Sequence, residues 1–248
     1  MLAYALLFVV ALWAGIQNAL AGGGTFITFP VLLSLGLDAR AANVTSTIAL
    51  FPGQVTTALA GRDQWSGNGR LSVRELVVIS LVGGVIGAGL LLLTPNSFFE
   101  RIVPFLVLIA TAIFAWGSFF RKTPEAAERH LSRRSLAASQ FAIAVYGGYF
   151  GGGIGILMLA ALTAAGWPFR SAGATKNLLA GVMNAAAVAV FAFSRDVAWT
   201  DAAVLAVGSI VGGQLGAWML ARVNVTALRV FVVTIGVLLT VGLFVRAY

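Results

Sequence analysis

The side chains best suited to binding an ion stand inside apolar stretches of this sequence. One group is Thr175, Lys176 and Asn177, with Asn184 further along the same stretch. A lysine toward the middle of a membrane-spanning helix costs about 2.5 to 3.5 kcal/mol on insertion scales, so it usually faces a cavity or a partner. Such a cation suits an anionic ligand. The alternative is that Lys176 lies close to its helix end, near Arg170, and extends to the lipid headgroups.

A matching polar group stands earlier in the chain. Thr45 and Ser46 correspond to Thr175 and Lys176, and Gln54 corresponds to Asn184. Amides inside a bilayer either bridge helices or contact a ligand, and bridging is the slightly favoured interpretation for this pair. The residues expected to donate hydrogen bonds to an anion are Thr45, Ser46, Thr175 and Asn177.

Two runs of three glycines precede these polar groups, at Gly22, Gly23 and Gly24 and at Gly151, Gly152 and Gly153. Three consecutive glycines break a helix, and a break inside a bilayer is tolerated where it is buried in protein or lines a wet cavity. A helix that restarts after the break presents free N–H groups and a partial positive dipole to an anion. The alternative is close helix packing.

The composition is that of a membrane protein. Of 248 residues 60% are hydrophobic and 10% are charged, far from the roughly 25% charged residues of soluble domains. The net charge of +8 comes from basic residues in short loops between apolar runs, which indicates membrane topology and not nucleic-acid binding. The chain has no cysteine, and its one histidine, His130, stands in a charged loop. We therefore predict no metal site, no cofactor and no enzyme activity.

Eight apolar segments are long enough to cross a bilayer. They lie near 2–34, 41–60, 74–94, 99–120, 136–164, 174–194, 201–221 and 226–246. The first and fifth are too long for simple spans and hold the triple glycines. We predict an all-α, polytopic membrane protein of about eight transmembrane segments, some of them glycine-broken or re-entrant.

The longest polar stretch divides the chain. Residues 121–135 carry several Lys and Arg, so the positive-inside rule predicts a cytoplasmic linker. Residues 1–120 would form the first transmembrane repeat and 136–248 the second. With eight crossings, both termini would also be cytoplasmic, in the inner (cytoplasmic) membrane.

The two halves are related in sequence. Ser80 to Ala88 (SLVGGVIGA) returns as Ser209 to Ala217 (SIVGGQLGA) at nearly the same offset as the triple glycines. Gly83 with Gly87 and Gly212 with Gly216 are expected to serve helix packing. An even number of crossings per half gives parallel repeats and an odd number gives inverted ones, and the segment count leaves both open.

These motifs resemble a known family. The stretch from Gly22 to Gly36 (GGGTFITFPVLLSLG), the element AANVTST, and the second copy from Gly147 to Gly155 (GGYFGGGIG) with AGATKN are similar to the TauE/SafE family. The resemblance implies two homologous halves and export of sulfite or organosulfur anions. The second half has Leu159 where Pro30 maps and Lys176 where Ser46 maps.

The sequence thus predicts a permease or exporter for a small anion such as sulfite, a sulfonate or another sulfur oxyanion, with its site between the halves. A passive anion channel, or a membrane scaffold without transport, is the alternative. The expected partners are the anion, the lipid bilayer and, as an open option, further copies of the chain.

Overall fold

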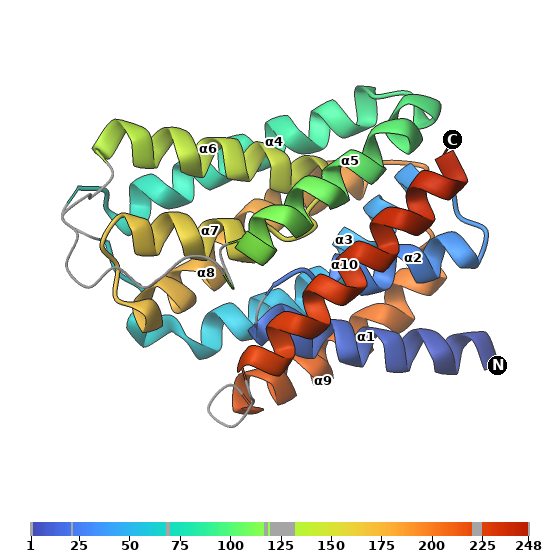
Figure 1. Ribbon diagram of the computed structural model, residues 1–248, viewed down its shortest axis with the longest axis horizontal. Coiled ribbons are helices and arrows are strands. Elements are labelled where there is room, and N and C mark those ends of the chain that lie inside the picture. The colour runs from blue at the N-terminus through green and yellow to red at the C-terminus, as the bar shows by residue number, and fades with distance from the viewer. Residues whose placement is uncertain are drawn as a thin grey trace.

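The computed structural model describes residues 2–247 without 21, 68–69, 117–118, 120–131 and 220–224, and this part of the chain folds into helices joined by short turns (Figure 1). Their bounds are α1 Leu2–Leu20, α2 Thr25–Ser34, α3 Ala39–Ala60, η1 Arg62–Gln64, α4 Val73–Leu93, α5 Asn96–Ala115, α6 Arg133–Tyr149, α7 Ile154–Ala164, α8 Phe169–Phe191, α9 Trp199–Met219 and α10 Val225–Ala247. The predicted all-α fold is confirmed.

Polar side chains fix where several helices begin. The Asp38 carboxylate accepts from the Ala41 N–H at the start of α3. Ser72 and Glu75 form a reciprocal capping box at the start of α4, and Ser132 caps α6. Such caps satisfy N–H groups that have no partner within the helix.

Each long apolar segment consists of two helices. The first, 2–34, contains α1 and α2, and the fifth, 136–164, contains α6 and α7, with a triple glycine between the members of each pair. Figure 1 shows that the short helices α2 and α7 turn back alongside α1 and α6. The triple glycines therefore separate two helices and do not bend one.

The two halves are inverted relative to each other. Thr45, near the start of α3, bonds the residue that precedes α9, so the start of α3 lies beside the end of α8. Thr175, near the start of α8, bonds Ser66 beyond the end of α3. The corresponding helices α3 and α8 thus run in opposite directions. Five helices per half give this inverted arrangement, which is common in transporters.

The same helix pairings recur when the halves are exchanged. α4 packs on α6 and α8, and α9 packs on α1 and α3. A Cβ on Gly83 would lie 2.5 Å from the Ala144 Cβ, and one on Gly212 would lie 2.0 Å from the Leu12 carbonyl oxygen. Side chains larger than hydrogen do not fit there, which confirms the predicted packing role of these two glycines.

Four described helices are long and apolar enough to cross a membrane by length and composition: Val73–Leu93, Asn96–Ile113, Arg170–Phe191 and Trp199–Met219. Many large apolar side chains on the outer faces are exposed, among them Val78, Val85 and Leu238. A surface of this kind belongs against lipid. The number of crossings stays a prediction.

The two ends of the bundle can be told apart. α1 begins and α10 ends at one end, here called the termini end. α3 and α5 end, and α4, α6 and α8 begin, at the other, here called the linker end (Figure 1).

The predicted linker, residues 121–135, falls largely outside the described residues, and its last three residues belong to α6. α5 ends and α6 begins at the end of the bundle opposite the termini. The linker and the termini thus lie at opposite ends of the bundle, because the α1–α2 and α6–α7 pairs each turn back on themselves. Which of these ends faces the cytoplasm stays a prediction.

Candidate substrate site between the two halves

The two glycine turns meet at the centre of the molecule. Gly22 and Gly23 have φ of +82° and +87°, and Gly151 and Gly153 have φ of +77° and +75°, a region that glycine enters without the steric cost of a Cβ. A Cβ on Gly22 would lie 2.9 Å from the Cα of Gly155 in the other half. The glycines therefore allow both the sharp turns and the contact between them.

Side chains from the end of α1 hold the first turn. The Gln17 side-chain amide donates to the Gly23 carbonyl oxygen at 3.2 Å, and the Gly24 N–H donates to the Asn18 side-chain oxygen at 3.2 Å. The local role of these two amides is thus to satisfy the backbone where the helix is broken, as buried polar groups require.

The second turn leaves donors free. Among the hydrogen bonds of the described residues, none accepts from the N–H groups of Gly153, Ile154 or Gly155, which open α7. Ile154 and Gly155 line a small cavity between the halves. A helix N-terminus with free N–H groups and its dipole is a favourable environment for an anion.

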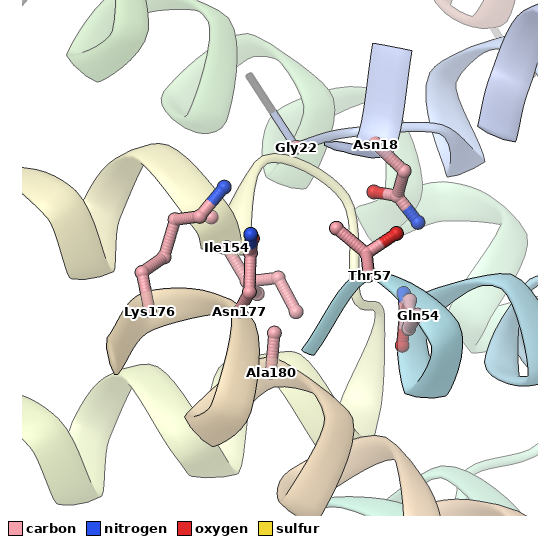
Figure 2. Close-up of a pocket in the computed structure, with 9 residues that line it drawn as sticks. Asn18, Gly22, Gln54, Thr57, Ile154, Lys176, Asn177 and Ala180 are labelled. Carbon is pink, nitrogen blue, oxygen red and sulfur yellow. The ribbon is translucent and has the colours of Figure 1, made fainter. Parts of the chain in front are cut away.

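Lys176 lines the same cavity from α8. Its residue exposure is 3%, so it does not reach the headgroups from the second turn of its helix. The structure gives it no hydrogen-bond acceptor or carboxylate partner within the described residues. In Figure 2, Lys176 and Asn177 stand on one side of the cavity, across from Thr57, Gln54 and Asn18. Lys176 is therefore a buried cation without a counterion among the described residues, and it faces a cavity lined by both halves.

The cavity is narrow in this conformation. Its free interior is about 20 Å³, which suffices for about one water molecule. Beside it, the Asn184 side-chain amide donates to the Gln54 side-chain oxygen at 2.6 Å. This bond joins α8 to α3, so the two amides bridge the halves, while Gln54 also lines the cavity.

The cavity lining includes four of the predicted site residues, Gly22, Gln54, Lys176 and Asn177. The remaining glycines, Gly23, Gly24, Gly151, Gly152 and Gly153, form the turns around it.

The predicted hydroxyl donors lie elsewhere. Thr45 accepts from the Ala198 N–H at 3.1 Å near the termini end, and Thr175 accepts from the Ser66 N–H at 3.2 Å near the linker end. The hydroxyls of Ser46 and Thr28 are hydrogen-bonded to each other. All three predicted donors are buried and engaged within the protein.

The two halves differ where the cavity lies. Gly155, in the lining, occupies the place that Phe26 holds in the first half, and Lys176 occupies the place of Ser46. On the termini side of the turns, buried and partly buried aromatic rings pack against one another. Their ring centroids lie 5.9 Å apart for Phe29 and Phe150 and 5.6 Å apart for Phe99 and Tyr149. These four rings and Phe26 are here called the aromatic cluster. The sequence difference explains why one half has the cavity.

An ion pair joins the halves beyond the aromatic cluster. The Arg40 Nε lies 2.9 Å from an Asp196 carboxylate oxygen, and a second guanidinium nitrogen donates to the Thr94 carbonyl oxygen at 3.1 Å. Arg170, the counterpart of Arg40 at the linker end, is exposed. The termini end is therefore held by an additional polar contact between the halves.

Sequence reasoning did not assign several lining residues to the site, namely Asn18, Thr57, Ile154, Gly155 and Ala180. Asn18 is a polar residue in an apolar segment shortly before the first triple glycine, and that position is the signal that could have identified it. For Thr57, the only sequence feature that indicates a binding role is a hydroxyl close to Gln54. Ile154 and Ala180 are apolar residues in apolar helices, and nothing in the sequence marks them as part of a binding site.

Comparisons with known proteins agree with this architecture. The family model described as "Sulfite exporter TauE/SafE" matches residues 7–243. The chain is 29% identical to a "Probable membrane transporter protein" of Haemophilus influenzae, over 95% of this chain and 92% of that protein. It is 31% identical to a "Probable membrane transporter protein ORF9" of Sinorhizobium sp, over 86% and 81%, and 26% identical to "Probable membrane transporter protein YfcA" of Escherichia coli K12, over 96% and 88%. With nearly its whole length matched, this multi-pass membrane protein belongs to the TauE/SafE family of membrane transporters.

Proposed function

We propose that this protein carries a small sulfur-containing oxyanion, such as sulfite or a sulfonate, across the cytoplasmic membrane. The observation that carries the proposal is Lys176, a buried cation in the cavity between the halves for which the described residues provide no counterion. An oxyanion beside Lys176 would neutralise its charge and accept hydrogen bonds from the free N–H groups of Ile154 and Gly155. Asn177 and Asn18 supply neutral donors on two further sides.

The charges of the other lining residues support an anion over a cation. Among the described residues, none that lines the cavity is acidic. Within the described residues, carboxylates stand at helix ends or in turns, as with Asp38, Glu75, Glu100 and Asp196. A cation site in a membrane normally uses carboxylates inside the protein. The family model, described as a sulfite exporter, agrees with this choice of substrate class.

The arginines favour one orientation in the membrane. The linker end holds seven described arginines and the termini end four. Since the positive-inside rule places basic loops in the cytoplasm, we propose that the linker end is cytoplasmic and that both termini face outward. The seven are Arg62, Arg70, Arg74, Arg133, Arg134, Arg170 and Arg229, and the four are Arg40, Arg101, Arg195 and Arg246.

The closed termini end supports a carrier more than an open pore. The cavity lies toward the linker end, since Thr57 is close to the end of α3 and Lys176 close to the start of α8. The aromatic cluster and the Arg40–Asp196 ion pair hold the two halves together toward the termini end. In transporters built from an inverted repeat, one bundle moves against the other and thereby opens the site to one end and closes it to the other.

The test is uptake of radiolabelled sulfite and a sulfonate panel into liposomes that contain the purified protein. A carrier gives saturable flux that competing oxyanions inhibit. Flux that rises linearly with concentration at rates far above carrier turnover would indicate a pore. An absence of flux for every sulfur anion would refute the substrate class.

A matched pair of variants connects the flux to the site. Lys176→Met removes the cavity cation, and Arg170→Met removes an exposed cation from the same helix. We expect the first to lose flux and the second to retain it. Equal flux in both variants and the unmodified protein would show that Lys176 does not bind the transported anion.

A further inference from the structure

A second recess lies on the outer surface at the linker end, where α4 and α6 begin. It has a volume of about 630 Å³, and its lining includes Arg74, Arg133 and Arg134 with Val78 and Ala137. It shares no lining residue with the cavity of Lys176. We call it the α4–α6 groove.

The groove is positively charged. Its one lining carboxylate, Glu75, is paired with Arg133 and also accepts from the N–H of Ser72. Within the described residues the structure gives no carboxylate partner for Arg74 or Arg134, and both side chains are exposed. Two guanidinium groups at the entrance are therefore available to a phosphate, which arginine binds with two parallel hydrogen bonds.

The groove is apolar away from the arginines. Val78 is 57% exposed, and the exposed apolar surface continues along α4 through Val82 and Val85. On α6 it includes Phe141, which is 40% exposed. Side chains of this kind on a membrane-spanning helix lie against acyl chains. Charge at the helix ends with apolar surface directly beyond it matches a molecule with an anionic head and hydrocarbon tails.

We propose that the α4–α6 groove binds an anionic phospholipid. The phosphate lies between Arg74 and Arg134, and an acyl chain follows Val78 toward the bilayer centre. Basic recesses between transmembrane helices on the cytoplasmic side are suited to such headgroups, and the cytoplasmic leaflet supplies them. The groove joins α4 of the first half to α6 of the second, so the bound lipid contacts both halves. This proposal does not depend on the transported anion.

The experiment is native mass spectrometry of the purified protein titrated with phosphatidylglycerol or with phosphatidylcholine of the same chain length. We expect phosphatidylglycerol to bind the unmodified protein more tightly. The double variant Arg74→Gln/Arg134→Gln should weaken that binding about fivefold for each arginine, with no change for phosphatidylcholine. The same binding of phosphatidylglycerol by the variant and the unmodified protein would overturn the proposal.

Two controls separate the site from general charge and from phosphate alone. Arg62→Gln removes an exposed arginine at the linker end and Arg195→Gln one at the termini end, and both should bind phosphatidylglycerol like the unmodified protein. Loss of binding in either control to the same extent would refute a local site. Glycerol 3-phosphate in excess should not displace the lipid, and complete displacement would show that the acyl chains contribute nothing.

Discussion

Replacing Lys176 with methionine tests the proposed site through two quantities, the KM for sulfite and the thermal stability of the protein without substrate. Methionine retains much of the length of the side chain and removes its charge. A hydrogen bond to a charged group contributes about 1.5 to 3 kcal/mol, so the KM for sulfite should rise roughly tenfold to a hundredfold. In the absence of substrate, the same substitution removes a buried ammonium group that has no counterion among the described residues. The thermal stability of the empty protein should therefore not fall.

The assay combines flux into liposomes with a thermal unfolding curve in detergent, for the same preparation. Sulfite should raise the melting temperature of the unmodified protein, because a ligand that binds the folded state stabilises it, and it should not do so for Lys176→Met. A loss of flux accompanied by an equal loss of stability without ligand would refute the reasoning, because Lys176 would then serve the fold. Arg170→Met, with its exposed side chain, is the control for both measurements.

Three further predictions follow from the packing of the two halves. Gly22→Ala should lower the free energy of unfolding by about 3 kcal/mol, because residue 22 has a positive φ and a Cβ there would contact the other half closely. Gly36→Ala should lower it by only about 1 kcal/mol, because residue 36 has a positive φ but open space around a Cβ. Thermal unfolding in detergent measures the difference, and equal losses of stability would contradict it. Arg40→Gln should raise the rate at which a maleimide added from the termini side labels a Thr28→Cys reporter, since the native chain has no cysteine; an unchanged rate would show that the ion pair does not limit access. Gly212→Ala should lower the yield of folded protein in size-exclusion chromatography, because its Cβ would overlap the backbone of α1, and a normal yield would refute the close packing.

The sequence allowed the duplicated, helical, glycine-broken architecture to be predicted. Triple glycines interrupt helices through backbone chemistry that does not depend on the rest of the fold, and the returning glycine motif at Ser80 and Ser209 marked the repeat. The inversion of the halves could not be predicted. A 33-residue apolar segment is compatible with one bent span or with a re-entrant pair, and the choice depends on which neighbouring helices bury the broken backbone.

The candidate site could be predicted in part, for a similar reason. Lys176 was conspicuous because a charge in an apolar segment needs a compensating environment. Thr45 and Thr175 occupy matching positions in the two halves and were expected to donate to the anion. A threonine hydroxyl can also accept from a backbone N–H, and both hydroxyls do so at the ends of neighbouring segments. Gly155 lines the cavity and lacks the ring that Phe26 has at the matching position, a difference that appears when the two glycine motifs are aligned in the sequence.

The aromatic cluster also has an electrical consequence. Five tightly packed rings between the cavity and the termini end leave little room for water, so this layer has a low dielectric constant and carries no mobile ions. Part of any voltage across the bilayer therefore falls across this layer. An anion that passes the cluster gains or loses that part of the roughly 2.3 kcal/mol that one charge exchanges with a potential of 100 mV over the whole bilayer. Voltage should thus act on the step that opens the cluster.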